Sequence, residues 1–143
     1  VVTPSVLGGL ELSDLPGTAV YLAGGELRPG ELSLVGSDTI DYIGGFNCDT
    51  AVLGVAGVDA LGGISDYHHA EANVKKAAIR IAKRTIVAAD RTKLGRAALV
   101  KISDLEAMSV LVTDADRRNS TVKAAESLGI SVTTVEPREM VQQ

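Results

Sequence analysis

Four stretches of the sequence carry glycine or charged side chains, and each directly follows a run of apolar residues. They begin at Ala23, Gly57, Asp90 and Thr113. Glycine lets backbone N–H groups approach a ligand closely, and a lysine such as Lys93 pairs with anionic groups such as phosphate. Carboxylates accept hydrogen bonds from the hydroxyl groups of a sugar. These residue types together predict a site for a small molecule that carries both hydroxyl and phosphate groups.

The apolar runs have the length of β-strands. They cover residues 18–22, 51–56, 85–89 and 110–112, while residues 32–35 alternate briefly and the β-rich residues 131–135 close the series. Continuously apolar runs, without alternating polar residues, are typical of strands buried on both faces of a parallel sheet. Ligands of an open parallel sheet bind beyond the carboxyl ends of its strands. We therefore expect the charged stretches to meet at one edge of the sheet.

Helical patterns separate these strands. The clearest covers residues 70–83, with Glu71 and Lys75 as a pair on the solvent side and a buried face formed by Val74, Ala77, Ala78 and Ile81. Weaker patterns predict helices at 37–46 and from Asn119 or Ser120 to Leu128. Strands that alternate with helices predict an α/β fold, in three layers, with a largely parallel sheet flanked by helices.

The composition is that of one ordinary globular domain. The chain has 143 residues, of which 45% are hydrophobic. Its 18 acidic against 14 basic residues argue against a DNA-binding surface, because DNA affinity rests on clustered lysine and arginine. No uncharged apolar stretch reaches the roughly 18 residues of a membrane helix. The only cysteine, Cys48, cannot form an internal disulfide, which favours the reducing cytoplasm.

Each candidate residue also has a purely structural interpretation. The pair Gly24-Gly25 and Asp59 are typical of turns, and Lys93 is compatible with a solvated surface position. Glu71 is favoured at the first turn of a helix by the helix dipole. His68-His69 has no acidic or cysteine partner at ligand spacing, so we expect no metal site and no cofactor.

Five short motifs, taken in order, resemble those of the DeoR family of transcriptional regulators. The order and the approximate spacing agree over nearly the whole chain. The motifs are Leu22–Arg28 followed by Leu34–Gly36, Val55–Asp59 through Gly62-Gly63, Ala70–Lys75, Asp90–Gly95 and Val112–Asp114.

The resemblance implies the C-terminal effector-sensing domain of such a regulator, with the fold shared by ribose-5-phosphate isomerase and CoA transferases. This domain would bind a phosphorylated sugar without catalysis. A separate N-terminal helix-turn-helix domain would bind operator DNA, as part of a homo-oligomer that represses genes of sugar metabolism. Carried over by position, the ligand-site candidates are Thr3, Ser5, Gly24, Gly25, Asp59, Glu71, Asp90 and Lys93.

The sequence departs from the family pattern at its beginning. Pro4 replaces the asparagine of a Thr-Asn-Ser stretch, which removes a side-chain amide and a backbone donor. The family's phosphate-binding Asp-x-Gly-Thr-Thr loop is absent, and so is the helix-turn-helix. The chain also starts at Val1, without an initiator methionine or a signal-peptide pattern. We therefore expect residues 1–143 to be a sensor domain that lacks its N-terminal strand–helix unit and the DNA-binding domain.

Two other functions stay open on the same residues. A sugar-phosphate isomerase needs a general base and acid, which Asp59 and Glu71 could supply while Lys93 stabilises an enediolate. The loop after residues 51–56, however, carries only one acid where the isomerases it resembles carry a dense acidic cluster. A purely structural oligomerisation domain is the third alternative, and it would show no stabilisation by ligands.

Overall fold

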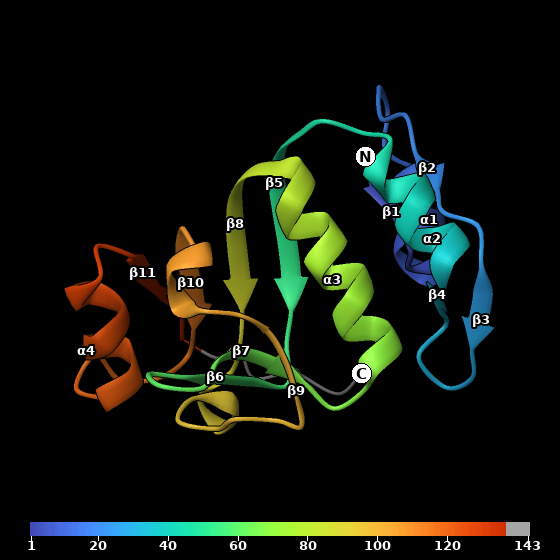
Figure 1. The fold of residues 1–143 in the computed structure, drawn as a ribbon. Helices are drawn as coiled ribbons and strands as arrows, with labels where there is room; N and C mark the ends of the chain where they lie inside the picture. The colour runs from blue at the N-terminus through green and yellow to red at the C-terminus, as the bar shows by residue number, and fades with distance from the viewer. Residues whose placement is uncertain (137–143) are drawn as a thin grey trace, which may run out of the picture.

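A four-stranded parallel sheet in the order β11–β10–β8–β5 forms the centre of the molecule (Figure 1). The computed structural model describes residues 1–136. The register places Leu53 opposite Val87, and Val87 opposite Leu111. All four strands were predicted, and the two longest begin three residues earlier than expected. Their bounds are Cys48–Gly54 for β5, Ala82–Ala88 for β8, Val110–Thr113 for β10 and Ser131–Thr134 for β11.

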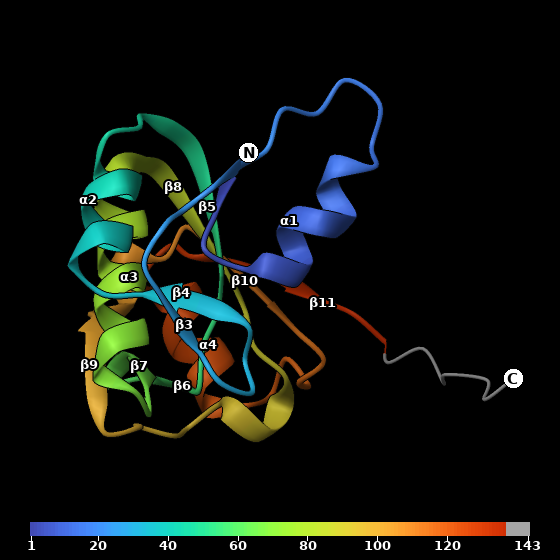
Figure 2. The same ribbon diagram turned by 90° about the vertical axis from the view of Figure 1, so that its right-hand side faces the viewer.

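The main core lies between one face of this sheet and the helices α3 (His69–Ile81) and α4 (Ser120–Ser127). Leu53, Val87 and Leu111 point into this core from the sheet, and Ala72 and Ala125 meet them from the two helices. In Figure 2, α3 and α2 (Ser37–Gly44) lie to the left of the strands and α1 (Val6–Ser13) to the right. The predicted α/β fold, a mostly parallel sheet flanked by helices, is confirmed.

Local signals fix the helix ends. The side chain of Asn119 accepts hydrogen bonds from the N–H groups of Thr121 and Val122, and Gly129 ends α4 with a φ of 79°. Helix α1 was not predicted, and the Ser5 hydroxyl begins it by accepting from the Gly8 N–H at 3.1 Å. The helix predicted at 70–83 ends at Ile81, because the residues after it pair with β5.

The N-terminal part contains two small sheets. Strands β1 (Val2–Thr3) and β2 (Tyr21–Leu22) are parallel, so only the end of the strand predicted at 18–22 forms a ladder. The strand predicted at 32–35 is β4 (Ser33–Val35), and it pairs antiparallel with β3 (Glu26–Arg28) instead of joining a parallel sheet. The reason is the turn between them, where Gly30 and Leu32 have positive φ and reverse the chain.

A second antiparallel sheet, absent from the prediction, lies below the carboxyl ends of β5 and β8 (Figure 1). It consists of β6 (Gly57–Asp59), β7 (Gly63–Asp66) and β9 (Val100–Ser103). Its strands are short, β6 and β7 each begin with a glycine, and β9 comes from far along the chain. Within residues 1–136, no helix has both the length and the apolar character needed to cross a membrane.

A cavity of about 450 Å³ separates the N-terminal strands from the central sheet. Residues 1–5 line one side of it and residues 48 and 50–54 of β5 line the other. Among the described residues, β1 pairs only with β2 and β5 pairs only with β8. The cavity therefore lies between two strands that each have an unpaired edge, and we call it the strand gap.

Candidate ligand-binding site

A larger cavity, of about 640 Å³, opens at the carboxyl ends of β1 and β5. We call it the ligand cavity. Pro4 and Ser5 follow β1, and residues 54–56 end β5, so the cavity spans the mouth of the strand gap. This is the edge at which the sequence predicted a site. The charged side chains and histidine that line the cavity are Glu31, Asp66, His68, Glu71, Lys75, Lys93 and Arg96.

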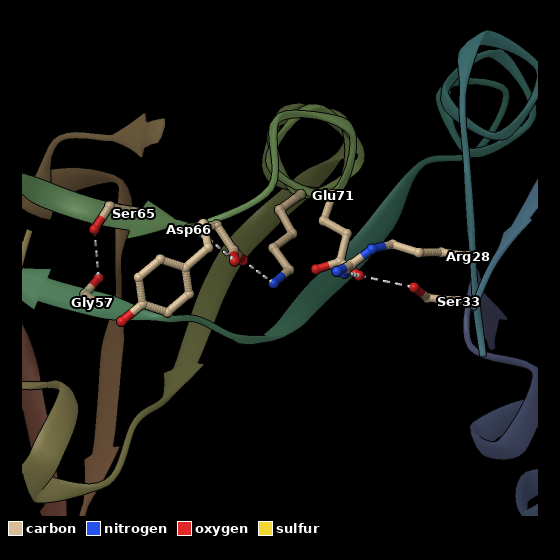
Figure 3. A network of polar contacts seen from close by, with 8 residues as sticks. Arg28, Ser33, Gly57, Ser65, Asp66 and Glu71 are labelled. Carbon is tan, nitrogen blue, oxygen red and sulfur yellow. Dashed lines mark hydrogen bonds and ion pairs between the residues drawn. The ribbon is translucent and has the colours of Figure 1, made fainter. Parts of the chain in front are cut away.

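Glu71 joins the first turn of α3 to the β3–β4 hairpin (Figure 3). Its Oε1 atom accepts from Arg28 Nη1 at 2.5 Å and from the Ser33 hydroxyl at 3.0 Å. No hydrogen bond from residues 1–136 reaches Oε2, so this oxygen is free to accept from a ligand hydroxyl. Arg28 neutralises the charge of Glu71, and the carboxylate can therefore stay half-buried in the cavity wall.

Asp66 forms the second ion pair at the cavity. It lies at the end of β7, its side chain is 7% exposed, and it pairs with Lys75 of α3. Its Oδ1 atom also accepts from the Tyr67 N–H at 2.8 Å. The predicted solvent-side pair between Glu71 and Lys75 is therefore wrong. The first turns of α3 face the cavity, and each of the two side chains finds a partner outside the helix.

The loop after β8 carries the basic side chains of the cavity. Asp90 begins a short 3₁₀ turn (Arg91–Lys93), and hydrogen bonds from the Thr92 hydroxyl and N–H lower the pKa of its carboxyl group. Lys93 Nζ lies 3.8 Å from Asp90 Oδ2, and Arg96 Nη1 donates to the Tyr67 hydroxyl at 3.1 Å.

Three contacts hold this loop against the small antiparallel sheet. The Gly95 N–H donates to the Val58 carbonyl at 2.8 Å, and the Ala98 N–H donates to the Ser65 hydroxyl at 2.8 Å. Gly57 lies so close to the Arg96 carbonyl that a Cβ atom at position 57 would be 2.3 Å from its oxygen. The small antiparallel sheet, which was not predicted, thus positions the loop after β8, which the sequence predicted to lie at the ligand site.

The structure brings some of the predicted ligand residues together and separates others. Ser5, Glu71 and Lys93 line the ligand cavity, whereas Thr3 lines the strand gap. Ligand contact by these residues stays a prediction. Several polar residues that the sequence did not name as ligand-site candidates line the same cavity: Ser33, Asp66, Tyr67, Lys75 and Arg96. Lys75 was predicted only as the helix partner of Glu71, and Asp66 lies on a strand that was not predicted.

The remaining predicted residues lie outside the lining of the ligand cavity and have structural contacts instead. The Gly24 carbonyl accepts from the Thr39 hydroxyl at 2.6 Å. Gly25 has a φ of 132°, and a Cβ there would be 2.0 Å from the same hydroxyl oxygen. Asp90 caps the 3₁₀ turn. For Gly24 and Gly25 these contacts agree with the structural interpretation that the sequence left open, whereas the capping role of Asp90 was not predicted.

Asp59 organises the turn between β6 and β7. Its Oδ2 atom accepts from the N–H groups of Gly62 at 2.7 Å and Leu61 at 3.0 Å, and these bonds lower the pKa of the carboxyl group. Since the folded pKa lies below the unfolded value, the stabilisation is present above about pH 4 and is lost as the pH falls through the folded pKa.

We expect Asp59→Ala to lower the free energy of unfolding by about 1 kcal/mol at pH 7, as the loss of a capping side chain does. Asp59→Asn keeps an acceptor oxygen without the charge, so it should retain part of the stability and lose the carboxylate's share of the pH dependence. Urea melts between pH 7 and pH 3 measure both effects. An unchanged pH dependence in the asparagine variant would contradict this role of the charge.

No group of three or more metal-ligating side chains occurs within residues 1–136. The cavity instead lies beside two ion pairs, Arg28–Glu71 and Lys75–Asp66, and beside the basic loop after β8. It opens at the strand ends of an open α/β sheet. These features suit a site for a small polar molecule. The chain belongs to the family of DeoR C-terminal sensor domains, whose model matches residues 1–115.

Named relatives agree with this family. The chain is 32% identical to the glycerol-3-phosphate regulon repressor of Escherichia coli (strain K12), over an alignment that covers 67% of this chain and 38% of the repressor. It is 34% identical to the HTH-type transcriptional repressor GlcR of Bacillus subtilis (strain 168), over 80% of this chain and 44% of GlcR. It is 30% identical to the HTH-type transcriptional regulator GlpR of Haloferax volcanii, over 92% of this chain and 51% of GlpR.

Two conclusions follow from these relatives. They are named as regulators, so the chain is a ligand-sensing regulatory domain, and the isomerase alternative is not supported. The chain also spans only about two fifths to one half of the length of these relatives.

Proposed function

We propose that this domain binds a phosphorylated sugar or polyol in the ligand cavity and thereby controls operator binding by a separate helix-turn-helix domain of the same regulator. The observation that carries the proposal is the separation of charge within the cavity. Glu71 and Asp66 are neutralised by Arg28 and Lys75, whereas the loop that carries Lys93 adds positive charge at another wall. Hydroxyl groups suit the first wall and a phosphate group suits the second.

The names of the relatives support the same class of ligand and the same role. Two of the proteins quoted above are repressors, and one of them is named for a glycerol-3-phosphate regulon. We propose that the intact regulator represses genes of sugar or polyol metabolism, acts in the cytoplasm and binds DNA as a homo-oligomer.

The strand gap supports a domain organisation in which a further strand of the regulator completes the sheet. Strands β1 and β5 line opposite sides of the gap, and each has an unpaired edge toward it. An inserted strand would pair with both and join the two parallel sheets into one. Its end would lie at the mouth of the gap, which Ser5 and Gly54 both line, so it would add backbone donors to the site.

Lys93→Ala tests the proposed orientation of the ligand. We expect at least a tenfold loss of affinity for a sugar phosphate and a much smaller loss for the corresponding free sugar, because a charged hydrogen bond contributes about 1.5–3 kcal/mol. Calorimetry with glycerol 3-phosphate, glucose 6-phosphate, glycerol and glucose measures both. Lys123→Ala, on the exposed side of α4, is the control. Equal losses for phosphorylated and free ligands would contradict the role of Lys93.

A thermal-shift screen of sugar phosphates tests the function itself. A ligand at about 100 times its dissociation constant should stabilise the domain by about 2.7 kcal/mol. In the intact regulator, the same compound should change the shift of operator DNA in a gel. Conversion of ribose 5-phosphate by the protein would instead support the isomerase alternative, and a screen without any stabilisation would argue against a sensor.

A further inference from the structure

We infer that Arg96, held in place by Tyr67, is a second cationic contact for the phosphate group, and that it makes the site prefer a doubly charged phosphate monoester to singly charged anions. The inference rests on the proposed function and adds the residue that distinguishes ligands by their charge. Both side chains line the ligand cavity beside Lys93.

Arg96 differs from the other cations of the cavity in the charge of its partner. Lys75 contacts a carboxylate, and Lys93 lies near Asp90. Arg96 contacts a neutral phenol, and no carboxylate of residues 1–136 lies within 4.0 Å of its guanidinium group. Its positive charge is therefore available to a ligand.

The position of Arg96 is fixed by its backbone. The residues before and after it are tied to the small sheet through Gly95 and Ala98, and its own carbonyl packs against Gly57. Ser65 accepts from Ala98 and donates to the Gly57 carbonyl at 3.4 Å, so one hydroxyl joins both strands to the loop (Figure 3). Because the backbone around Arg96 is already held in place, binding an anion costs little backbone conformational entropy.

Tyr67 orients the side chain without neutralising it. Its hydroxyl accepts from Arg96 Nη1, and its own backbone N–H is held by Asp66 at the end of β7. An aspartate or glutamate in this place would orient Arg96 equally well but would also cancel its charge. The planar guanidinium group can bind two phosphate oxygens at once, which lysine cannot. Arg96 thus adds to Lys93 a positive charge that no carboxylate of residues 1–136 neutralises, which favours the second negative charge of a phosphate monoester above its second pKa of about 6.

Methyl phosphate and methyl sulfate are matched probes, because both are small tetrahedral esters and differ by one charge at pH 8. Chemical-shift titrations of the protein with each probe give the affinities. We expect the unsubstituted protein to bind methyl phosphate at least tenfold more tightly than methyl sulfate. Arg96→Gln should weaken methyl phosphate binding about tenfold, affect methyl sulfate less and leave the melting temperature unchanged. Tyr67→Phe should lower the affinity for methyl phosphate about threefold.

Arg80→Gln, exposed on α3 and outside the cavity lining, is the control and should bind both probes as the unsubstituted protein does. If Arg96→Gln binds methyl phosphate as tightly as the unsubstituted protein, or loses affinity equally for both probes, the inference is wrong and the proposed function stands. If the unsubstituted protein binds neither these probes nor any sugar phosphate, the proposed function fails and the inference fails with it.

Discussion

Leu111→Ala is expected to lower the free energy of unfolding by about 3–5 kcal/mol. Leu111 is the central apolar residue of β10, it is 0% exposed, and its neighbours across the sheet are Val87 and Val132. Removing its side chain loses the transfer free energy of the buried atoms and leaves a cavity that the sheet cannot close. Urea or thermal unfolding followed by circular dichroism measures the change.

Two further alanine variants define the scale of that result. Leu61→Ala, at a position that is 94% exposed, should change the stability by no more than about 0.5 kcal/mol. Ile81→Ala should fall between them, because Ile81, predicted to lie on the buried face of α3, is only partly buried. A loss at position 111 no larger than that at position 61 would mean that the core is wrongly described.

Gly57→Ala is expected to destabilise the domain by about 3 kcal/mol and to abolish ligand binding. The new Cβ atom would lie 2.3 Å from the Arg96 carbonyl oxygen and 2.8 Å from the Ser65 hydroxyl, and a backbone atom cannot turn away as a side chain can. The loop must move, and Lys93 and Arg96 move with it. Unfolding and calorimetry on the same variant separate the loss of stability from the loss of binding.

Gly24→Ala is the matched control for this substitution. No atom lies within 4 Å of a Cβ atom at position 24, so the added methyl group meets open space. We expect near-normal stability and near-normal ligand binding. A large loss of sugar-phosphate binding in this variant, with stability intact, would support Gly24 as a ligand contact.

The sequence predicts those parts of the fold whose signals are local. Apolar residues at helical spacing identify α3 to within two residues at either end, and continuous apolar runs identify β5, β8, β10 and β11. Asn119 and Gly129 identify the ends of α4. Each of these signals lies within a few residues of the element that it predicts, so one sequence is sufficient.

Elements that depend on distant partners could not be predicted in the same way. Strands β6 and β7 are three and four residues long, and glycine-rich stretches of this kind are equally typical of a ligand loop. What makes them a sheet is the pairing of β7 with β9, about 37 residues further along the chain. Helix α1 has one buried residue, a glycine, and so it lacks the apolar face that identifies a helix.

The candidate site follows the same division. Lys93 was predicted because charged residues after apolar runs meet at one edge of a parallel sheet, and Glu71 because it matches a family motif at the start of a predicted helix. Their partners were not, because Arg28 is 43 residues from Glu71 and Tyr67 is 29 residues from Arg96. Asp59 and Gly25 have residue types suited to ligand binding, but the same types also make tight turns, and only the observed contacts distinguish the two uses.

The ligand cavity has walls on both sides of the strand gap, and this has a dynamic consequence. Ser5 follows β1 of the N-terminal strands, whereas Gly54 ends β5 of the central sheet and Lys93 lies in the loop after β8. A molecule that contacts both sides would act as a removable cross-link, so its occupancy would set the amplitude of relative motion between the two parts of the domain. A DNA-binding domain joined to the N-terminal strands would experience this change as a change in its own orientational freedom, even if the average structure hardly moved.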